Sequence, residues 1–257
     1  MGVSINTNKT LGVSTGTSII APQTSFVNTH SVELDGIDAY VNVADNNNLS
    51  FGDGSSDSAF SISAWIRPDD NDKFRIIFKY NVTTSLREYY FQTAGGLKLQ
   101  AGLYDAGTAA SLTRNGNTTI PENVWSHVVM TYNGNGLNTG IKIYLNGSLD
   151  NGSVSGGGSY TAMHNTNEPL LIGKFNGSTP SFANGEIDEV AIFNAELSAT
   201  DITNIYNSGI PTDLSEFSSL VSWWRFEEGS GTSVADSGSG SNAGTLENAA
   251  TFSTNTP

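Results

Sequence analysis

The chain is 257 residues long, has no cysteine and carries a formal net charge of −14, with 25 acidic and 11 basic side chains. This charge disfavours nucleic acid and anionic membranes as partners, since both repel a negative surface. No apolar run approaches the roughly 20 residues of a membrane span, and the N-terminus lacks the basic and apolar regions of a signal peptide, so we expect neither feature.

Residues 1–30 differ in composition from the rest of the chain. Lys9 is their only lysine, arginine, aspartate or glutamate, and serine, threonine, asparagine and glycine fill most of the segment. Such a segment cannot bury enough apolar surface to form a core of its own. We predict an N-terminal arm over 1–30 that contacts identical subunits or other proteins; the alternative is a disordered tail.

From Ser31 onward the sequence has the pattern of many short strands separated by turns. Alternation of apolar and polar residues is clearest in FSISAWIRP (60–68), which Pro68 ends. Further strands are predicted over 31–43, 75–80, 88–94, 97–104, 124–134, 141–147 and 169–175. With about a dozen such strands and no alternation of strands with helices, we predict an all-β fold: an antiparallel two-sheet jelly-roll sandwich with one short helix.

The helix is predicted in the second half of GEIDEVAIFNAELSATDITNIY (185–206), where Ser198 is a candidate N-cap. Strict alternation over the first half places Asp188 on the same face as Val190 and Ile192. A carboxylate on such a face needs a hydrogen bond, an ionic partner or a cation. The block 220–257 is then predicted to return as strands that close a domain spanning 31–257.

Several of these segments, taken in order, resemble the laminin-G-like domains of the concanavalin A-like lectin/glucanase superfamily: LDGIDAYV, FSISAWIRP, WSHVVMTYNG, IKIYLNG, LLIGKFNG and GEIDEVAIFNAELSATDI. The resemblance covers 31–209 and implies a jelly roll, often with one calcium ion, that binds carbohydrate or protein at the rim of its loops. The block WWRFEEGSGTSVADSGSGSNAGTL also resembles this family, in which it usually precedes the first strand. In this chain the block follows the helix, and this order of segments resembles that of proteins from bacteriophage particles.

The segment Glu186-Ile187-Asp188-Glu189 resembles part of the Glu-x-Asp-x-Glu strand of laminarinase-like hydrolases. That chemistry needs two glutamates that point into one cleft, as nucleophile and as acid/base. The residue four positions after Glu186 is Val190, so the second catalytic carboxylate is missing. We therefore predict no enzymatic activity and no catalytic residues.

A calcium site is predicted at Asp188, with Asp38 as a second ligand, because the resemblance implies calcium and this ion prefers oxygen ligands. The alternative for Asp35 and Asp38 is that they accept hydrogen bonds from their own turn. For the acidic stretch 69–72 a solvated loop is favoured over a metal site.

Sugar binding needs exposed aromatic rings surrounded by amides and acids. The predicted ligand-binding residues are placed on loops, and ordinary loop packing is the alternative for each of them: Tyr104, Asp105, Arg114, Asn115, Tyr160 and His164. His127, inside a predicted strand, is interpreted as a structural residue that bonds across strands.

We predict a non-enzymatic surface or structural protein of a virion, of the decoration or tail-fibre kind, with host glycans as a candidate ligand. Its predicted location is the virion, and its predicted partners are other virion proteins or identical subunits. The first alternative is a secreted carbohydrate-binding or adhesion module at the cell surface or outside the cell. The second alternative is a glycan hydrolase.

Overall fold

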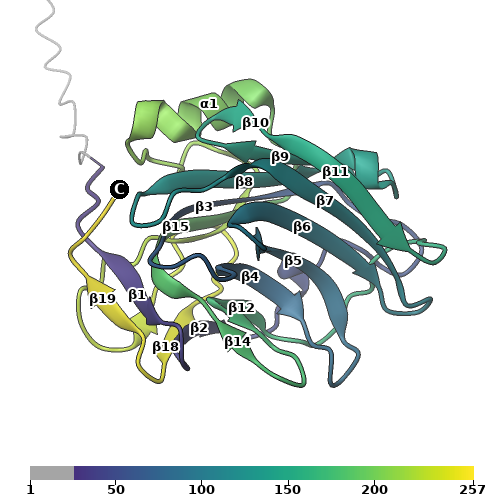
Figure 1. Cartoon of the computed structure of the whole chain (residues 1–257), viewed down its shortest axis with the longest axis horizontal. Helices are drawn as coiled ribbons and strands as arrows, with labels where there is room; N and C mark the ends of the chain where they lie inside the picture. The colour runs from purple at the N-terminus through teal and green to yellow at the C-terminus, as the bar shows by residue number, and fades with distance from the viewer. Residues whose placement is uncertain (1–25) are drawn as a thin grey trace, which may run out of the picture.

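The computed structural model describes residues 26–257 and shows two packed antiparallel sheets (Figure 1). The eight-stranded sheet contains, in spatial order, β10 (Ser148–Leu149), β9 (Ile141–Leu145), β8 (Ser126–Tyr132), β3 (Phe60–Pro68), β15 (Asn184–Phe193), β1 (Ser31–Asp35) and β19 (Thr251–Ser253), with β16 (Leu220–Trp224) also paired to β15. The nine-stranded sheet contains β11 (Asn151–Gly157), β7 (Ala110–Thr119), β6 (Lys98–Asp105), β5 (Arg87–Ala94), β4 (Arg75–Tyr80), β12 (Leu170–Ile172), β2 (Tyr40–Val43), β18 (Gly244–Glu247) and β17 (Ser233–Val234).

A two-stranded ribbon of β13 (Lys174–Phe175) and β14 (Ser181–Phe182) lies beside β4. The one α-helix in the described part of the chain is α1 (Ala199–Tyr206), and short 3₁₀ turns lie at Asn47–Leu49, Asn138–Gly140 and Asn207–Gly209. This architecture confirms the predicted jelly-roll sandwich. None of the helices in 26–257 is long and apolar enough to cross a membrane.

The main core lies between the two sheets and consists of inward-facing aliphatic and aromatic residues. Phe51, Phe60 and Tyr89 form its aromatic centre, with the rings of Phe51 and Phe60 stacked at 4.4 Å. Burial of such side chains supplies most of the free energy that stabilises a sandwich of this size.

The outer face of the eight-stranded sheet is covered by α1 and the segment that follows it, which Figure 1 shows at the top of the molecule. Ser198 caps α1 with a capping box, as predicted, and Ile202 and Ile205 pack into a second core with Trp223. His127 lies under this cover, where its Nε2 is 2.8 Å from Ser63 Oγ and burial lowers its pKa to about 3. The structural role predicted for His127 is confirmed.

Strand β15 contains a bulge between Asp188 and Ala191 that the sequence pattern did not predict. Glu189 has a φ of 49°, a left-handed backbone conformation, and its amide bonds to Asp188 Oδ1 at 2.8 Å. Ile187 faces the core before the bulge, while Val190 and Ile192 face it afterwards. The prediction that Asp188 shares a face with Val190 and Ile192 is therefore wrong, because one extra residue reverses the alternation.

The C-terminal block gives strands to both sheets. β18 pairs with β2 in the nine-stranded sheet, and β19 pairs with β1 in the other. The C-terminus therefore ends beside the start of the described chain, where Ser31 Oγ donates to the carbonyl of Asn255 at 2.7 Å (Figure 1).

The predicted boundary of the N-terminal arm at residue 30 is wrong in the part that the structure describes. The ring of Phe26 stacks on Trp223 at 6.0 Å, and Asn28 bonds to Asp188. The backbone and hydroxyl of Thr29 bond to Glu227 at 2.8 and 2.6 Å. Residues 26–30 therefore pack on this domain, and the rest of the predicted arm, 1–25, lies outside the described residues.

Candidate functional site

The outer face of the nine-stranded sheet carries a cluster of aromatic side chains, of which Phe78 is buried and the other four are half-buried. We define the aromatic face as Phe78, Tyr80, Tyr90, Tyr104 and Phe175, which come from β4, β5, β6 and the ribbon strand β13. Phe78 stacks on Tyr90 at 5.5 Å, and Tyr80 meets Tyr90 and Tyr104 edge-on at 5.6 and 5.7 Å. Such rings would normally lie inside a core, so their exposure on one sheet face indicates a binding surface.

A row of polar side chains crosses the same face beside the rings. Gln92 on β5 donates to Gln100 on β6 at 2.7 Å, and Gln100 donates to Asn115 on β7 at 2.8 Å. Arg75 on β4 bonds to Gln92 at one end of the row, and Asn115 donates to Ser153 Oγ on β11 at the other, at 3.2 Å. These cross-strand bonds fix the orientation of the amides, so their remaining donors and acceptors are preorganised for hydrogen bonds to a ligand.

The rings and the polar row meet at a pocket of about 230 Å³. Its lining residues are Lys73, Arg75, Phe78, Tyr80, Tyr90, Gln92 and Phe175. This volume lies below the roughly 300–1,000 Å³ of pockets for drug-sized ligands, so the pocket fits one unit of a longer ligand that extends along the sheet.

Gly102 allows the ring of Tyr90 to lie across β6. A Cβ atom at this position would come within 2.3 Å of the Tyr90 ring, and no side chain tolerates that distance. Burial raises the pKa of Tyr90 and of Tyr80, so both phenols stay protonated at neutral pH and can donate hydrogen bonds.

Two of the residues predicted from sequence to bind ligand lie on this face. They are Tyr104, whose hydroxyl accepts a hydrogen bond of 2.7 Å from Arg87, and Asn115 in the polar row. Both are strand residues, in β6 and β7, so their predicted placement on loops is wrong. Arg114 is a strand residue too, but it points away from Asn115 and donates to the carbonyl of Ile141 at 3.0 Å. Its role is to join β7 to β9.

The remaining predicted residues form a separate cluster where the loops meet. Asp105 is buried and accepts hydrogen bonds from the backbone of Gly107 and Thr161, and its Oδ1 lies 3.2 Å from His164 Nε2. The hydroxyl of Tyr160 donates to Asp57 at 2.7 Å. These bonds tie two loops together, which matches the alternative interpretation of loop packing.

The members of the aromatic face that sequence reasoning missed are Phe78, Tyr80, Tyr90 and Phe175, together with Arg75 and Gln92. The sequence pattern predicts RIIFKY and EYYFQTA only as strands and assigns them no ligand-binding residue. A signal was nonetheless present, because aromatic residues occupy both alternating faces of EYYFQTA, whereas a strand with one solvated face has polar residues there.

The two predicted calcium ligands do not form one site. Asp188 lies near the Ser31 end of β1, while Asp38 follows the Asp35 end, and at about 3.3 Å per residue they are separated by more than 10 Å. Both oxygens of Asp188 accept hydrogen bonds, from Asn28 at 2.9 Å and from its own neighbour. Within 26–257 no group of three or more His, Asp or Glu side chains could hold a metal ion. Calcium binding elsewhere stays a prediction from the resemblance.

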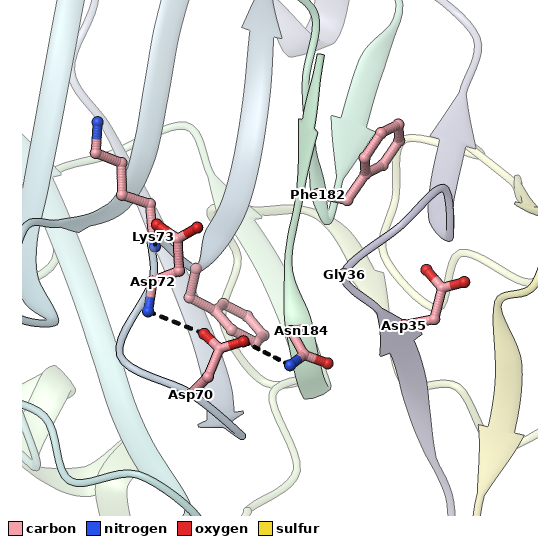
Figure 2. Close-up of a pocket in the computed structure, with 8 residues that line it drawn as sticks. Asp35, Gly36, Asp70, Asp72, Lys73, Phe182 and Asn184 are labelled. Atoms are coloured by element: carbon pink, nitrogen blue, oxygen red, sulfur yellow. Dashed lines mark hydrogen bonds between the residues drawn. The ribbon is translucent and has the colours of Figure 1, made fainter. Parts of the chain in front are cut away.

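Asp35 behaves as its alternative interpretation predicts. Its Oδ1 accepts from the backbone nitrogens of the next turn, at 2.8 Å from Ile37 and 3.0 Å from Asp38. Asp35 also lines a pocket of about 130 Å³ together with Asp70 and Asp72 (Figure 2). Figure 2 shows Asp70 bonded to the backbone nitrogen of Asp72 and to Asn184, with Asp35 on the other side of the Gly36 turn. These carboxylates stabilise loops.

The acidic residues of β15 have structural partners. Glu186 is 3.2 Å from Arg67 and accepts a hydrogen bond of 2.6 Å from Ser253. Glu189 accepts from Trp223 Nε1, and Asp188 is fully buried. The position of the missing second glutamate, Val190, faces the core. This arrangement provides no pair of carboxylates that flank an open cleft.

Comparison with known proteins gives one family and a set of similar folds. The family model described as the concanavalin A-like lectin/glucanases superfamily matches residues 35–203. No curated protein matches the chain.

Among solved structures, a proposed carbohydrate binding protein from Bacteroides ovatus has a TM-score of 0.61 and 19% identity, covering 89% of this chain. The chain spans 60% of that protein's length. The binding domain of botulinum neurotoxin serotype G has a TM-score of 0.49 and 19% identity, with 69% of this chain and 42% of that one covered. A heptameric pentraxin from Limulus polyphemus has a TM-score of 0.46 and 13% identity, with 70% and 82% covered.

Proposed function

The chain belongs to the concanavalin A-like lectin/glucanases superfamily, and we propose that it is a non-enzymatic carbohydrate-binding domain whose aromatic face holds an oligosaccharide. The observation that carries this proposal is the combination of Tyr80, Tyr90 and Phe175 with a fixed row of amides around one pocket. The Bacteroides ovatus protein of the same fold, itself a proposed carbohydrate binding protein, is consistent with it.

The chemistry of sugars fits this surface. One face of a sugar ring presents C–H groups that pack on aromatic rings, and its hydroxyls both donate and accept hydrogen bonds. The side-chain amides of Gln92, Gln100 and Asn115 also do both, and the protonated phenols of Tyr80 and Tyr90 add donors. Because the row crosses β4, β5, β6 and β7, it supports a ligand of several sugar units rather than a single one.

The absence of hydrolysis is part of the proposal. It is supported by Glu186 and Glu189, whose carboxylates bond to Arg67 and Trp223 on the other sheet, away from the aromatic face. The virion setting and its extracellular alternative are proposals that rest on sequence resemblance alone.

Screening on a glycan array tests the proposed function. Wild-type protein should bind a restricted set of oligosaccharides, and Tyr80→Ala should lose most of that binding, because the packing of a sugar on an aromatic ring of this kind contributes on the order of 1 kcal/mol or more. Tyr206→Ala, which removes a tyrosine from α1 on the opposite side, is the matched control and should keep the binding.

Two outcomes would reject the proposal. One is that the folded wild-type protein binds no glycan on the array. The other is that Tyr80→Ala and Tyr206→Ala, each with a circular dichroism spectrum like that of wild type, bind equally well. Release of reducing sugar from any bound glycan would instead show that the non-enzymatic part is wrong.

A further inference from the structure

The cations of this acidic protein are distributed unevenly. Within 26–257 the lysines and arginines that form ion pairs are Arg67, Lys79, Lys142 and Arg225. Those that form no ion pair there are Lys73, Arg75, Arg87, Lys98, Arg114 and Lys174. Residues 1–25 contain no aspartate or glutamate that could pair with them. Lys73, Arg75, Arg87 and Lys174 lie on or beside the aromatic face, and Lys98 lies at the far end of β6 on the same side of the sheet.

Acidic side chains are missing from the same face. The outward-facing residues of β4, β5, β6 and β7 contain no aspartate or glutamate, in a chain with 25 of them. The cross-strand register identifies these residues as Arg75, Phe78, Tyr80, Arg87, Tyr90, Gln92, Lys98, Gln100, Gly102, Tyr104, Ser111, Thr113 and Asn115. Acids at its borders include Asp72 in the loop before β4 and the buried Glu168, which accepts hydrogen bonds from Asn81 and Asn176. This face is therefore a local positive surface on a protein of charge −14.

Arg75 is the residue of this surface that most strongly indicates an anionic ligand. It is 9% exposed and lines the pocket, yet its hydrogen bonds go to neutral partners, Gln92 and Ser181, the latter at 2.9 Å. Burial lowers its pKa, and Asp72 opposes this at longer range. A charge taken out of water without a counter-ion is costly.

Lys79, four residues further along β4, is a buried cation whose charge is balanced by carboxylates of the protein itself. Its ammonium is fully buried and lies 2.9 Å from Glu88 and 2.7 Å from Asp45. Arg75 has no such carboxylate within the described part of the chain. The difference indicates that an anion from outside the protein completes the surroundings of Arg75.

Arg87 provides a second cation at the other end of the aromatic face. Its guanidinium lies 4.7 Å from the ring centre of Tyr104 and 5.6 Å from that of Tyr80, and its Nε is buried without a hydrogen-bond partner. Arg87 pairs with Tyr80 and Arg75 pairs with Gln92, so the two arginines are five residues apart along the strands, or about 15 Å. Lys174 lies at the border, 3.8 Å above the ring of Tyr40.

We propose that the oligosaccharide bound by the aromatic face is acidic, with carboxylate or sulfate groups on several of its sugar units, and that Arg75 and Arg87 pair with those groups. This inference rests on the proposed function and adds the substrate class. The rings contact the sugar backbone while the arginines bind the anionic groups, for which the planar guanidinium provides two parallel donors. The separation of the two arginines favours an anionic chain over a ligand with a single charge.

The test compares probes that differ in charge on one sugar backbone. Hexagalacturonate, its fully methyl-esterified form and a heparin-derived hexasaccharide are titrated into the protein by calorimetry at low and high salt. One of the acidic probes should bind at least about tenfold more tightly than the neutral ester, and its affinity should fall as salt rises. Comparison of the two acidic probes distinguishes carboxylate from sulfate.

Variants then locate the effect. Arg87→Gln and Lys174→Gln should each weaken binding of the acidic probe, and Arg75→Gln should weaken it by about tenfold. Lys142→Gln, which removes the same charge from β9 of the other sheet, is the control and should have no comparable effect. Because Arg75 is buried, its variant is compared only after thermal unfolding shows that it folds; the half-buried Lys174 and Arg87 keep the test independent of it.

The inference fails if the neutral ester binds as tightly as the acid, or if Arg87→Gln and Lys174→Gln bind the acidic probe as Lys142→Gln does. In the first case the proposed glycan binding still stands. If neither neutral nor acidic oligosaccharides bind, the proposed function fails with it. A hexaglutamate peptide serves as a further probe. If it bound as tightly as the acidic oligosaccharide, and if Tyr80→Ala left that binding unchanged, the site would be one for acidic peptides, and both the inference and the proposed function would fail.

Discussion

The side-chain amide of Asn28 donates a hydrogen bond of 2.9 Å to Oδ2 of Asp188, a fully buried carboxylate 160 residues further along the chain. The other oxygen of Asp188 accepts from the backbone of Glu189, in the bulge of β15. The segment just before β1 therefore completes the hydrogen bonding of an acid that the sheet alone would leave short of partners.

Replacing this residue tests the role of the contact. Asn28→Ala should lower the free energy of unfolding by about 1–3 kcal/mol, because it removes a hydrogen bond from a buried carboxylate. Urea denaturation followed by circular dichroism measures the change. Asn117→Ala, at an exposed position, is the control, and equal midpoints for the two variants would contradict the assigned role.

The stability of the protein should depend on pH through Glu189. Burial raises its pKa to about 8, against the charge of Arg225 and the hydrogen bond from Trp223, and burial also raises the pKa of Asp188 well above its usual range. An acid with a raised pKa holds its proton more tightly in the folded state, so its contribution to stability is present at low pH and is lost as the pH rises towards about 8.

The window from pH 6.5 to 8 separates the effect of the buried acids from that of His127. Burial lowers the pKa of His127 to about 3, and that group destabilises the fold only as the pH falls below its ordinary value of 6.5. Between pH 6.5 and 8 the unfolding free energy should fall by about 1–2 kcal/mol in wild type. Glu189→Gln keeps an acceptor for Trp223 and should show a smaller fall; identical slopes for both proteins would disprove this account.

Two truncations test where the domain begins. Removing residues 1–25 leaves all the described contacts of Phe26, Asn28 and Thr29, so the melting temperature should stay close to that of the full chain. Removing residues 1–30 deletes those contacts and should lower it by several degrees. Equal melting temperatures would show that residues 26–30 add nothing to stability. Light scattering on the same proteins tests the remaining prediction, that the segment 1–25 contacts identical subunits.

Gly102→Ala should weaken glycan binding without touching a polar or charged group. The new Cβ would come within 2.3 Å of the Tyr90 ring, so the ring must move off β6. We expect a loss of binding of at least about fivefold with a small change in stability, because the end of the tyrosine side chain can shift. Gly95→Ala, where no atom lies within 4 Å of the new Cβ, is the control. If Gly102→Ala bound the glycan with unchanged affinity, Tyr90 would not be part of the binding site.

Much of the fold could be predicted from the sequence because short local patterns specify the individual strands and the helix. The alternation in FSISAWIRP and the capping residue Ser198 each specify a short element, and both recur in the structure. The bulge in β15 could not be predicted, since it depends on a left-handed backbone at Glu189 that no glycine marks.

The site was harder to predict because it depends on which strands become neighbours. The sequence predicts Tyr104 and Asn115 as ligand-binding residues, and both lie on the aromatic face's side of the sheet, but Phe175 comes from a ribbon far along the chain and meets Phe78 only in the folded protein. For Asp38 and Asp188 the sequence predicts a shared site that the folded chain does not form. Both are acidic residues typical of calcium sites, yet the register of β1 with β15 keeps them apart.

Mapping the glycan contact by nuclear magnetic resonance tests the central claim most directly. Isotope-labelled protein is titrated with the glycan that binds most tightly on the array, and the backbone amide shifts are followed. The account predicts that the largest changes occur in β4, β5 and β6, at Tyr80, Tyr90, Gln92 and Gln100. Largest changes around Asp105 and His164, or along α1, would contradict it.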